Sequence, residues 1–224
     1  MRHLFENANL IPFLLIGALL LPWARTGLVR RCAISADLLD HPNERSSHMV
    51  PTPRGGGIAI VASFLLLVLG LGRAGVIEAR LCIVIIGGGL LVATLGFMDD
   101  RSSLPARWRF LGHAAAAAWV LWWMGRVPRM PVFGTLVDLS YAGPALCGLY
   151  LVWMINLFNF MDDGIDGIAS VEAITTALGG ALLWWLVGSG TGWLVAVLFV
   201  GCVGGFLVAF IEHGQLKRKM GSRA

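Results

Sequence analysis

Three aspartates stand close together in a chain that is otherwise mostly apolar. Asp162, Asp163 and Asp166 lie within the stretch NLFNFMDDGIDGIAS, which runs from residue 156 to residue 170. Asparagine and aspartate side chains can bind a sugar, a base edge or a metal ion through their oxygen and amide groups, and the glycines between them permit close approach of a ligand. The same residue types also form ordinary turns and helix caps. The stretch is therefore either a polar binding site or a turn between two helices.

Asp99 and Asp100 form a second acidic pair, at the end of another apolar run. Adjacent carboxylates repel each other, and a divalent cation would remove that repulsion. Mg²⁺ commonly binds one or two carboxylates together with the phosphate groups of a substrate. The alternative interpretation is a solvated helix end. Whether the pair binds a metal ion therefore depends on the other residues around it.

A third polar stretch, DHPNERSSHMVPTPRGGG, runs from residue 40 to residue 57. Its prolines favour an extended backbone, and Arg45, His48 and Arg54 can bind phosphate. The glycines at its end are expected to begin a helix, whose first backbone N–H groups attract anions. A basic loop attracted to anionic lipid is the alternative. Together, the three stretches offer carboxylates for a metal and basic groups for phosphate.

The composition indicates the environment of these residues. The chain has 224 residues, of which 57% are hydrophobic and 13% charged, and its mean hydropathy is +0.77. Soluble domains carry roughly a quarter charged residues. We therefore expect an integral membrane protein, with one membrane domain over residues 1–211, a basic cytoplasmic tail over residues 212–224, and no nucleic-acid partner. The four cysteines lack metal-site spacing and are expected to be free thiols.

A bilayer-spanning helix needs about 20 predominantly apolar residues. The predicted fold class is all-α, a polytopic transmembrane helical bundle of about seven spans. The predicted spans are residues 7–23, 56–72, 76–98, 108–125, 141–159, 170–188 and 191–211. The first is interpreted as a retained span and not a signal peptide, and the fifth is the least regular because glycine and proline interrupt it. The segment 125–140 is expected to be an external loop or a small hairpin.

The distribution of charge predicts the orientation of the spans. Most of the 17 Lys and Arg residues, including Arg25, Arg30 and Arg31 in the first predicted loop, fall on one side of the bundle. The positive-inside rule places that side in the cytoplasm and the N-terminus outside. The acidic stretches then lie at cytoplasmic helix ends, whereas ion and proton pathways carry carboxylates at mid-depth. This favours a reaction between a soluble phosphate compound and a lipid over transport.

Three stretches resemble one family, the polyprenyl-phosphate N-acetylhexosamine-1-phosphate transferases of glycosyltransferase family 4. They read DHPNERSSHMVPTPRGGGIAI, GFMDDRSSLPARWRFLGH and WMINLFNFMDDGIDGIASVEA, and they occur in the family's order. They are most similar to the bacterial branch that starts surface polysaccharides, such as the O-antigen of lipopolysaccharide. The peptidoglycan branch has a longer, Lys-rich first motif. A CDP-alcohol phosphotransferase is disfavoured because neither an Ala-Arg pair nor a further aspartate follows Asp166.

The resemblance implies a transfer reaction. A UDP-N-acetylhexosamine would donate its sugar 1-phosphate to undecaprenyl phosphate, with release of UMP and a requirement for Mg²⁺, to begin a cell-surface polysaccharide or cell-wall glycan. It implies a multi-pass protein of the bacterial inner membrane with its active site facing the cytoplasm, and it is compatible with a homodimer. Our mechanistic hypothesis is a single displacement by the lipid phosphate. The alternative is a phospho-enzyme formed on an aspartate.

The family motifs also imply roles for individual residues at the positions that match them. Asp99 and Asp100 are the expected catalytic residues and, with Asp162 and Asp163, the expected metal ligands. The expected substrate-binding residues are His48, Thr52, Arg54, Asn156, Asn159 and Asp166.

Two features depart from the family pattern. The family reads N-x-x-D-G-x-D-G, whereas here both Asp162 and Asp163 stand between Asn159 and Gly164, and one extra residue turns a helix by about 100°. In addition, the family continues beyond Gly204–Ala209 into a further aspartate motif and a histidine motif, which this sequence lacks. The resemblance thus predicts a C-terminally truncated member. The alternative is an inactive or lipid-binding remnant of the family.

Overall fold

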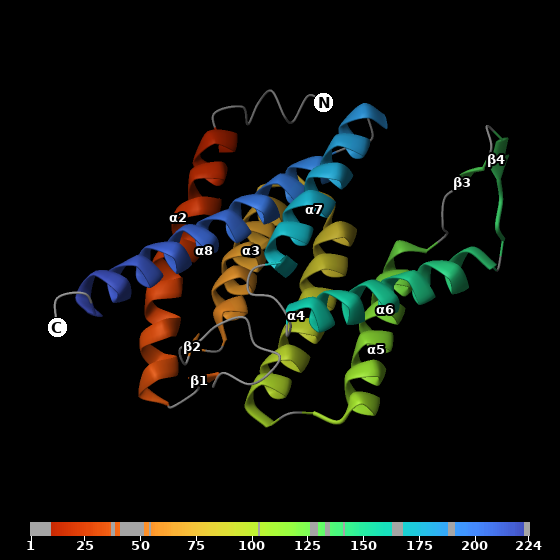
Figure 1. Ribbon diagram of the computed structural model, residues 1–224. Coiled ribbons are helices and arrows are strands. Elements are labelled where there is room, and N and C mark those ends of the chain that lie inside the picture. Colours follow the sequence, from red (N-terminus) through yellow and green to blue (C-terminus); the bar gives the residue numbers. More distant parts are fainter. Residues whose placement is uncertain are drawn as a thin grey trace. The chain divides into compact units, whose positions relative to one another are not determined.

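The computed structural model describes residues 10–36, 39–40, 52–53, 55–102, 104–125, 130–132, 135–140, 142–162, 168–187 and 191–221 (Figure 1). Seven helices and two short β-hairpins make up this part of the chain. The helices are α2 (Leu10–Ser35), α3 (Gly56–Arg73), α4 (Ala79–Ser102), α5 (Ala106–Met124), α6 (Ala142–Asp162), α7 (Ile168–Val187) and α8 (Gly192–Gly221). The strands are β1 (Leu39–Asp40), β2 (Thr52–Pro53), β3 (Met130–Val132) and β4 (Thr135–Val137). The predicted all-α fold class is confirmed.

Five of the described helices are long and apolar enough to cross a membrane. These spans are Ile11–Ser35, Gly56–Arg73, Ala79–Ser102, Ala142–Asn159 and Gly192–Glu212. α7 contains a shorter apolar segment, Ala173–Leu186, and α5 occupies the fourth predicted span. The chain is therefore a multi-pass membrane protein with a helix at each of the seven predicted positions.

The first helix differs most from its prediction. α2 continues to Ser35, well beyond the predicted end at residue 23, so the prediction that Arg25 lies in a loop is wrong. Pro22 lacks a backbone donor, but it is buried against Gly205 of α8. The Thr26 hydroxyl also donates to the Pro22 carbonyl at 2.6 Å. The helix continues past Pro22, with this bond and the contact with α8 at the proline.

α6 is an unbroken helix despite the glycine and proline at its start. Gly143 and Pro144 lie in its first turn, where backbone N–H groups have no intrahelical partner and a missing donor costs little. The backbone N–H groups of Ala142 and Gly143 donate to the Leu139 carbonyl at 2.8 and 3.2 Å. The helix therefore begins on the preceding turn, and the irregular residues fall where they are tolerated.

Both β-hairpins are antiparallel. β3 and β4 pair with Pro131 opposite Leu136, which confirms the hairpin predicted within residues 125–140. β1 and β2 pair with Asp40 opposite Thr52. This second pairing joins the two ends of the first polar loop.

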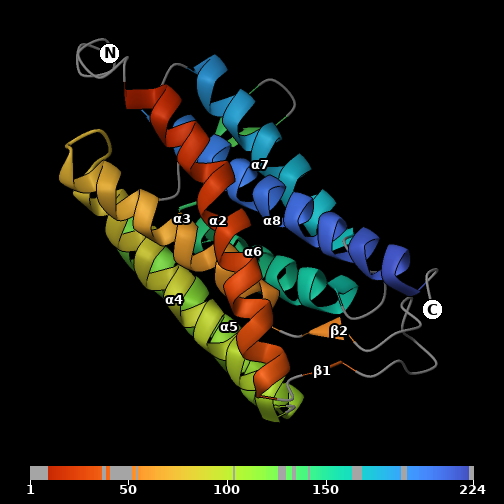
Figure 2. The same cartoon turned by 90° about the vertical axis from the view of Figure 1, so that its left-hand side faces the viewer.

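The chain divides into two compact units. One comprises residues 1–77 and 161–224, with α2, α3, α7 and α8, and the other comprises residues 78–160, with α4, α5 and α6. In the first unit α8 contacts all three of the other helices, and Figure 2 shows α2 in front of α3 and α8. The first unit is therefore organised around α8.

Glycines on α8 let α2 approach closely. A Cβ atom at Gly205 would overlap the carbonyl oxygen of Leu19, and one at Gly201 would lie 2.9 Å from a side-chain atom of α2. Small residues spaced four apart permit such contacts between membrane helices. On another face of α8, the rings of Phe64 and Phe199 meet edge to face with centroids 5.1 Å apart. These contacts hold α2 and α3 against α8.

In the second unit, α4 and α5 lie side by side (Figure 2). Two glycines make room for this contact, because a Cβ atom at Gly87 would overlap the Trp119 ring and one at Gly112 would overlap the Leu95 side chain. The indole N–H of Trp119 also donates to the Ile83 carbonyl at 3.1 Å. The paired helices position the turn between them, which carries the first acidic motif.

Candidate functional site at the turn between α4 and α5

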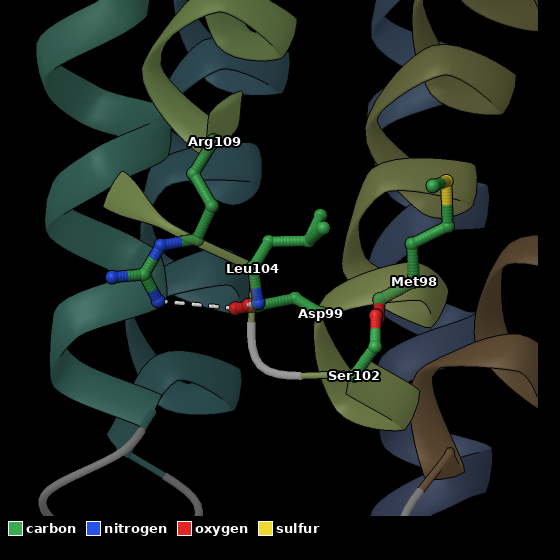
Figure 3. Close-up of polar contacts among 5 residues, drawn as sticks. All are labelled: Met98, Asp99, Ser102, Leu104 and Arg109. Carbon is green, nitrogen blue, oxygen red and sulfur yellow. Dashed lines mark hydrogen bonds and ion pairs between the residues drawn. The ribbon is translucent and has the colours of Figure 1, made fainter. Parts of the chain in front are cut away.

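Asp99 accepts hydrogen bonds through both of its carboxylate oxygens (Figure 3). Oδ1 accepts from the backbone N–H of Leu104 at 2.6 Å, and Oδ2 accepts from the Arg109 guanidinium at 3.0 Å. The Asp99 side chain is 19% exposed and that of Arg109 is 32% exposed. Asp99 thus closes the turn and ties the end of α4 to the start of α5.

The start of α5 is basic. Arg107 and Arg109 both lie in its first turn, where the helix dipole disfavours positive charge. For Arg109, the ion pair with the Asp99 carboxylate at 3.0 Å offsets the unfavourable interaction with the helix dipole. The Arg107 guanidinium instead lies over the Trp108 ring, 5.9 Å from its centroid. The turn therefore brings two guanidinium groups and a carboxylate to one end of the helix pair.

Asp100 has a different environment from Asp99. The two residues follow each other on α4, so their side chains project about 100° apart, and Asp100 is exposed. Within the described ranges, no group of three or more His, Cys, Asp or Glu side chains could hold a metal ion. The Mg²⁺ site predicted at Asp99 and Asp100 stays a prediction.

Asn156 and Asn159 lie near the end of α6 and are half-buried. Their spacing of three residues places them on one face of the helix. The Asn156 amide donates to the Val152 carbonyl at 2.7 Å. This bond to the preceding turn orients the Asn156 side chain.

His113 is a candidate that the sequence interpretation missed. It is only 4% exposed, and its Nδ1 atom has no hydrogen-bond partner in the part of the chain that the structure describes. Asn156 lies close enough to influence the imidazole by hydrogen bonding, and the charges of Arg109 and Asp99 also act on it. We call Asp99, Arg109, His113 and Asn156 the polar cluster of the second unit. Its sequence signal is a histidine at the start of an alanine run, four residues after Arg109.

The first-loop candidates are only partly described. Thr52 lies in β2 opposite Asp40 of β1, whereas His48 and Arg54 lie outside the described residues. α3 begins at Gly56, directly after Gly55, whose φ is 84°. This confirms the prediction that the glycines begin a helix. Anion binding at this helix start stays a prediction.

The third acidic stretch falls mostly outside the described residues. Asp162 is the last residue of α6, and its side chain is not described. Asp163 and Asp166 lie in the undescribed segment that follows. The roles predicted for these three aspartates stay predictions.

Comparison with known proteins identifies relatives of this chain. The family described as "Glycosyl transferase family 4" matches residues 81–213. A decaprenyl-phosphate N-acetylglucosaminephosphotransferase of Mycolicibacterium smegmatis is 37% identical over 73% of this chain and 42% of its own length. The protein of the same description from Mycobacterium leprae is 32% identical over 78% of this chain and 47% of its own length.

A more distant relative comes from another bacterium. A probable undecaprenyl-phosphate N-acetylglucosaminyl 1-phosphate transferase of Bacillus subtilis is 29% identical over 65% of this chain and 40% of its own length. The chain spans less than half the length of each of these three relatives. The family match covers more than half of the chain, including the turn with Asp99 and Arg109 and both asparagines of α6. The chain therefore belongs to glycosyl transferase family 4.

Proposed function

We propose that this chain transfers an N-acetylhexosamine 1-phosphate from a UDP-sugar to a polyprenyl phosphate, with release of UMP. The observation that carries the proposal is the family match across the α4–α5 turn and the end of α6, two segments that carry carboxylate, guanidinium and amide groups. The relatives are described as phosphotransferases that act with decaprenyl or undecaprenyl phosphate and N-acetylglucosamine. We propose undecaprenyl phosphate as the acceptor and the start of a cell-surface polysaccharide as the role.

The proposed reaction is a direct displacement. An oxygen of the lipid phosphate forms a bond to the β-phosphorus of the UDP-sugar, while the bond from that phosphorus to the bridging oxygen breaks and UMP leaves. A phosphate monoester has a second pKa of about 6, so the acceptor is largely a dianion near neutral pH. A strong base is therefore unnecessary, and positioning and charge neutralisation supply most of the catalysis.

The residues of the α4–α5 turn are suited to charge neutralisation. Arg107 and Arg109 supply positive charge that can neutralise the diphosphate as charge builds on the leaving UMP. Asp99 orients Arg109 through their ion pair at 3.0 Å. Asn156 and Asn159 offer amide groups for the sugar or the base.

We propose that Mg²⁺ is the cofactor. When bound, it would neutralise negative charge on the diphosphate. Asp100 suits a metal ligand because the residue is exposed. Each oxygen of Asp99 accepts one hydrogen bond and keeps a further lone pair that could bind a metal ion.

We further propose that the protein resides in the bacterial inner membrane with this turn at the cytoplasmic face. The proposal rests on the positive-inside rule and on the basic residues at the start of α5. UDP-sugars are soluble phosphate compounds, so a site at the membrane boundary gives both substrates access. A homodimer is compatible with this placement.

A donor panel tests the proposed reaction. Membranes that contain the chain are incubated with undecaprenyl phosphate, Mg²⁺ and each of several UDP-N-acetylhexosamines, and UMP release is measured. We expect release with at least one donor, and at least about a hundredfold less with Asp100→Asn. Glu78→Gln, which changes an exposed carboxylate at the other end of α4, should leave the rate unchanged. Release of UMP in the absence of lipid phosphate would contradict the proposal.

A further inference from the structure

Arg25 lies within the apolar span of α2 and not in a loop. Its guanidinium donates to the Ser63 hydroxyl of α3 at 3.1 Å, and Ser63 is fully buried. α2 lies against both α3 and α8 in this unit (Figure 2). The guanidinium of α2 is therefore bound to a buried hydroxyl of α3.

The depth of this group is unusual for a charge. Ser63 follows the first residue of α3, Gly56, by seven positions, which is about 10 Å along the helix axis. Both α2 and α3 qualify as membrane spans by length and composition. A charged side chain at such depth is costly, and it commonly pairs with another group or marks a functional site.

The described partners do not neutralise Arg25. Ser63 accepts one hydrogen bond and uses its own proton to donate to the Ala59 carbonyl at 2.7 Å. Glu212, an acidic residue of α8, instead accepts from the Trp23 indole at 3.0 Å. A guanidinium carries five N–H donors, and among the described residues no carboxylate pairs with Arg25. Among the described residues, Ser63 therefore accepts from one of the five donors of Arg25.

The surroundings limit what a further ligand of Arg25 could be. In an apolar span, the abundant anions are the phosphate groups of lipids at the nearby membrane surface. A guanidinium matches the geometry of phosphate through paired N–H groups. Ser63 fixes one edge of the guanidinium and leaves other donors for the phosphate oxygens.

We propose that Arg25, held by Ser63, binds the phosphate group of a membrane lipid. Two kinds of lipid carry such a negatively charged phosphate group: a polyprenyl phosphate, as a phosphate monoester, and an anionic phospholipid, as a phosphodiester. The site shares no residue with the α4–α5 turn, so it goes beyond the proposed transfer and does not depend on it.

Native mass spectrometry of the purified full chain in detergent tests the proposal. The probes are undecaprenyl phosphate, phosphatidylglycerol and, as a neutral control, undecaprenol. We expect Arg25→Gln to retain at least about tenfold less phosphate-bearing lipid than the wild type, with undecaprenol binding unchanged. Arg31→Gln removes an exposed charge from the same helix and should stay within about twofold of the wild type for all three probes.

The arms of the experiment separate the two sources of phosphate. A loss confined to undecaprenyl phosphate assigns the site to the acceptor lipid, and a loss for both phosphate lipids assigns it to anionic lipid in general. Equal retention by folded Arg25→Gln and Arg31→Gln would overturn the proposal. If Arg25→Gln does not fold, Arg25→Lys replaces it, since Lys keeps the charge but cannot form paired hydrogen bonds. Undiminished binding by that variant would then overturn the proposal. None of these outcomes depends on sugar-phosphate transfer.

Discussion

At the scale of single residues, Asp99 joins the two helices of the second unit through Leu104 and Arg109. We expect Asp99→Asn to lower the free energy of unfolding by about 1–2 kcal/mol, because a charge-assisted bond is lost and partial exposure limits its contribution. Denaturant unfolding in detergent, followed by tryptophan fluorescence, measures this change. Glu78→Gln is the matched control and should unfold like the wild type. An Asp99→Asn variant of wild-type stability would show that the turn does not need the carboxylate.

His113 offers a second residue-scale prediction. Replacing a buried polar side chain that lacks a full set of partners with an apolar one can be nearly neutral for stability, so His113→Leu should unfold within about 1 kcal/mol of the wild type. We nevertheless expect its kcat to fall by about tenfold or more, because the Asn156 side chain loses the imidazole that helps to position it. His113→Gln keeps hydrogen-bonding capacity and should recover most of the loss. Equal rates for the Leu and Gln variants would contradict a positioning role.

At the scale of elements, the tightest contact between α2 and α8 is at Gly205. A side chain at Gly205 would meet the Leu19 backbone, which cannot move aside without separating the helices. We expect Gly205→Ala to lower the free energy of unfolding by about 2 kcal/mol or more. Gly204→Ala is the control on the same helix, because its Cβ would lie an ordinary 3.7 Å from a Leu19 side-chain atom. Equal unfolding midpoints for the two variants would show that the helices are not closely packed there.

The elements also show which parts of the fold the sequence reveals. Apolar runs predicted α3 and α4 because their boundaries coincide with glycines and charged residues. The end of α2 was not predictable, because Pro22 and the arginines after it resemble a loop, and only contact with Gly205 distinguishes them. The ion pair of Asp99 with Arg109 was equally hidden, although both lie in the same motif. The pair depends on the conformation of the turn, which local composition does not determine.

At the scale of the whole molecule, the orientation can be tested with a natural probe. Cys32 is exposed near the cytoplasmic end predicted for α2, whereas Cys147 is partly exposed and Cys82 and Cys202 are buried. A membrane-impermeant maleimide should therefore label Cys32 in inside-out vesicles and not in right-side-out vesicles. Cys32→Ser should remove most of this labelling. Labelling of Cys32 from the outside would contradict the predicted orientation, with the N-terminus outside.

The central claim is that this family member moves a sugar phosphate onto a lipid, and one measurement tests it most directly. Purified chain is supplied with UDP-N-acetylglucosamine carrying a radiolabelled β-phosphate, together with undecaprenyl phosphate and Mg²⁺. We predict that the label enters the organic phase as a lipid-linked sugar diphosphate in equal amount to the UMP released. Asp100→Asn should abolish this transfer and Glu78→Gln should not. Label that stays in the aqueous phase, or that attaches to the protein without lipid, would contradict direct transfer.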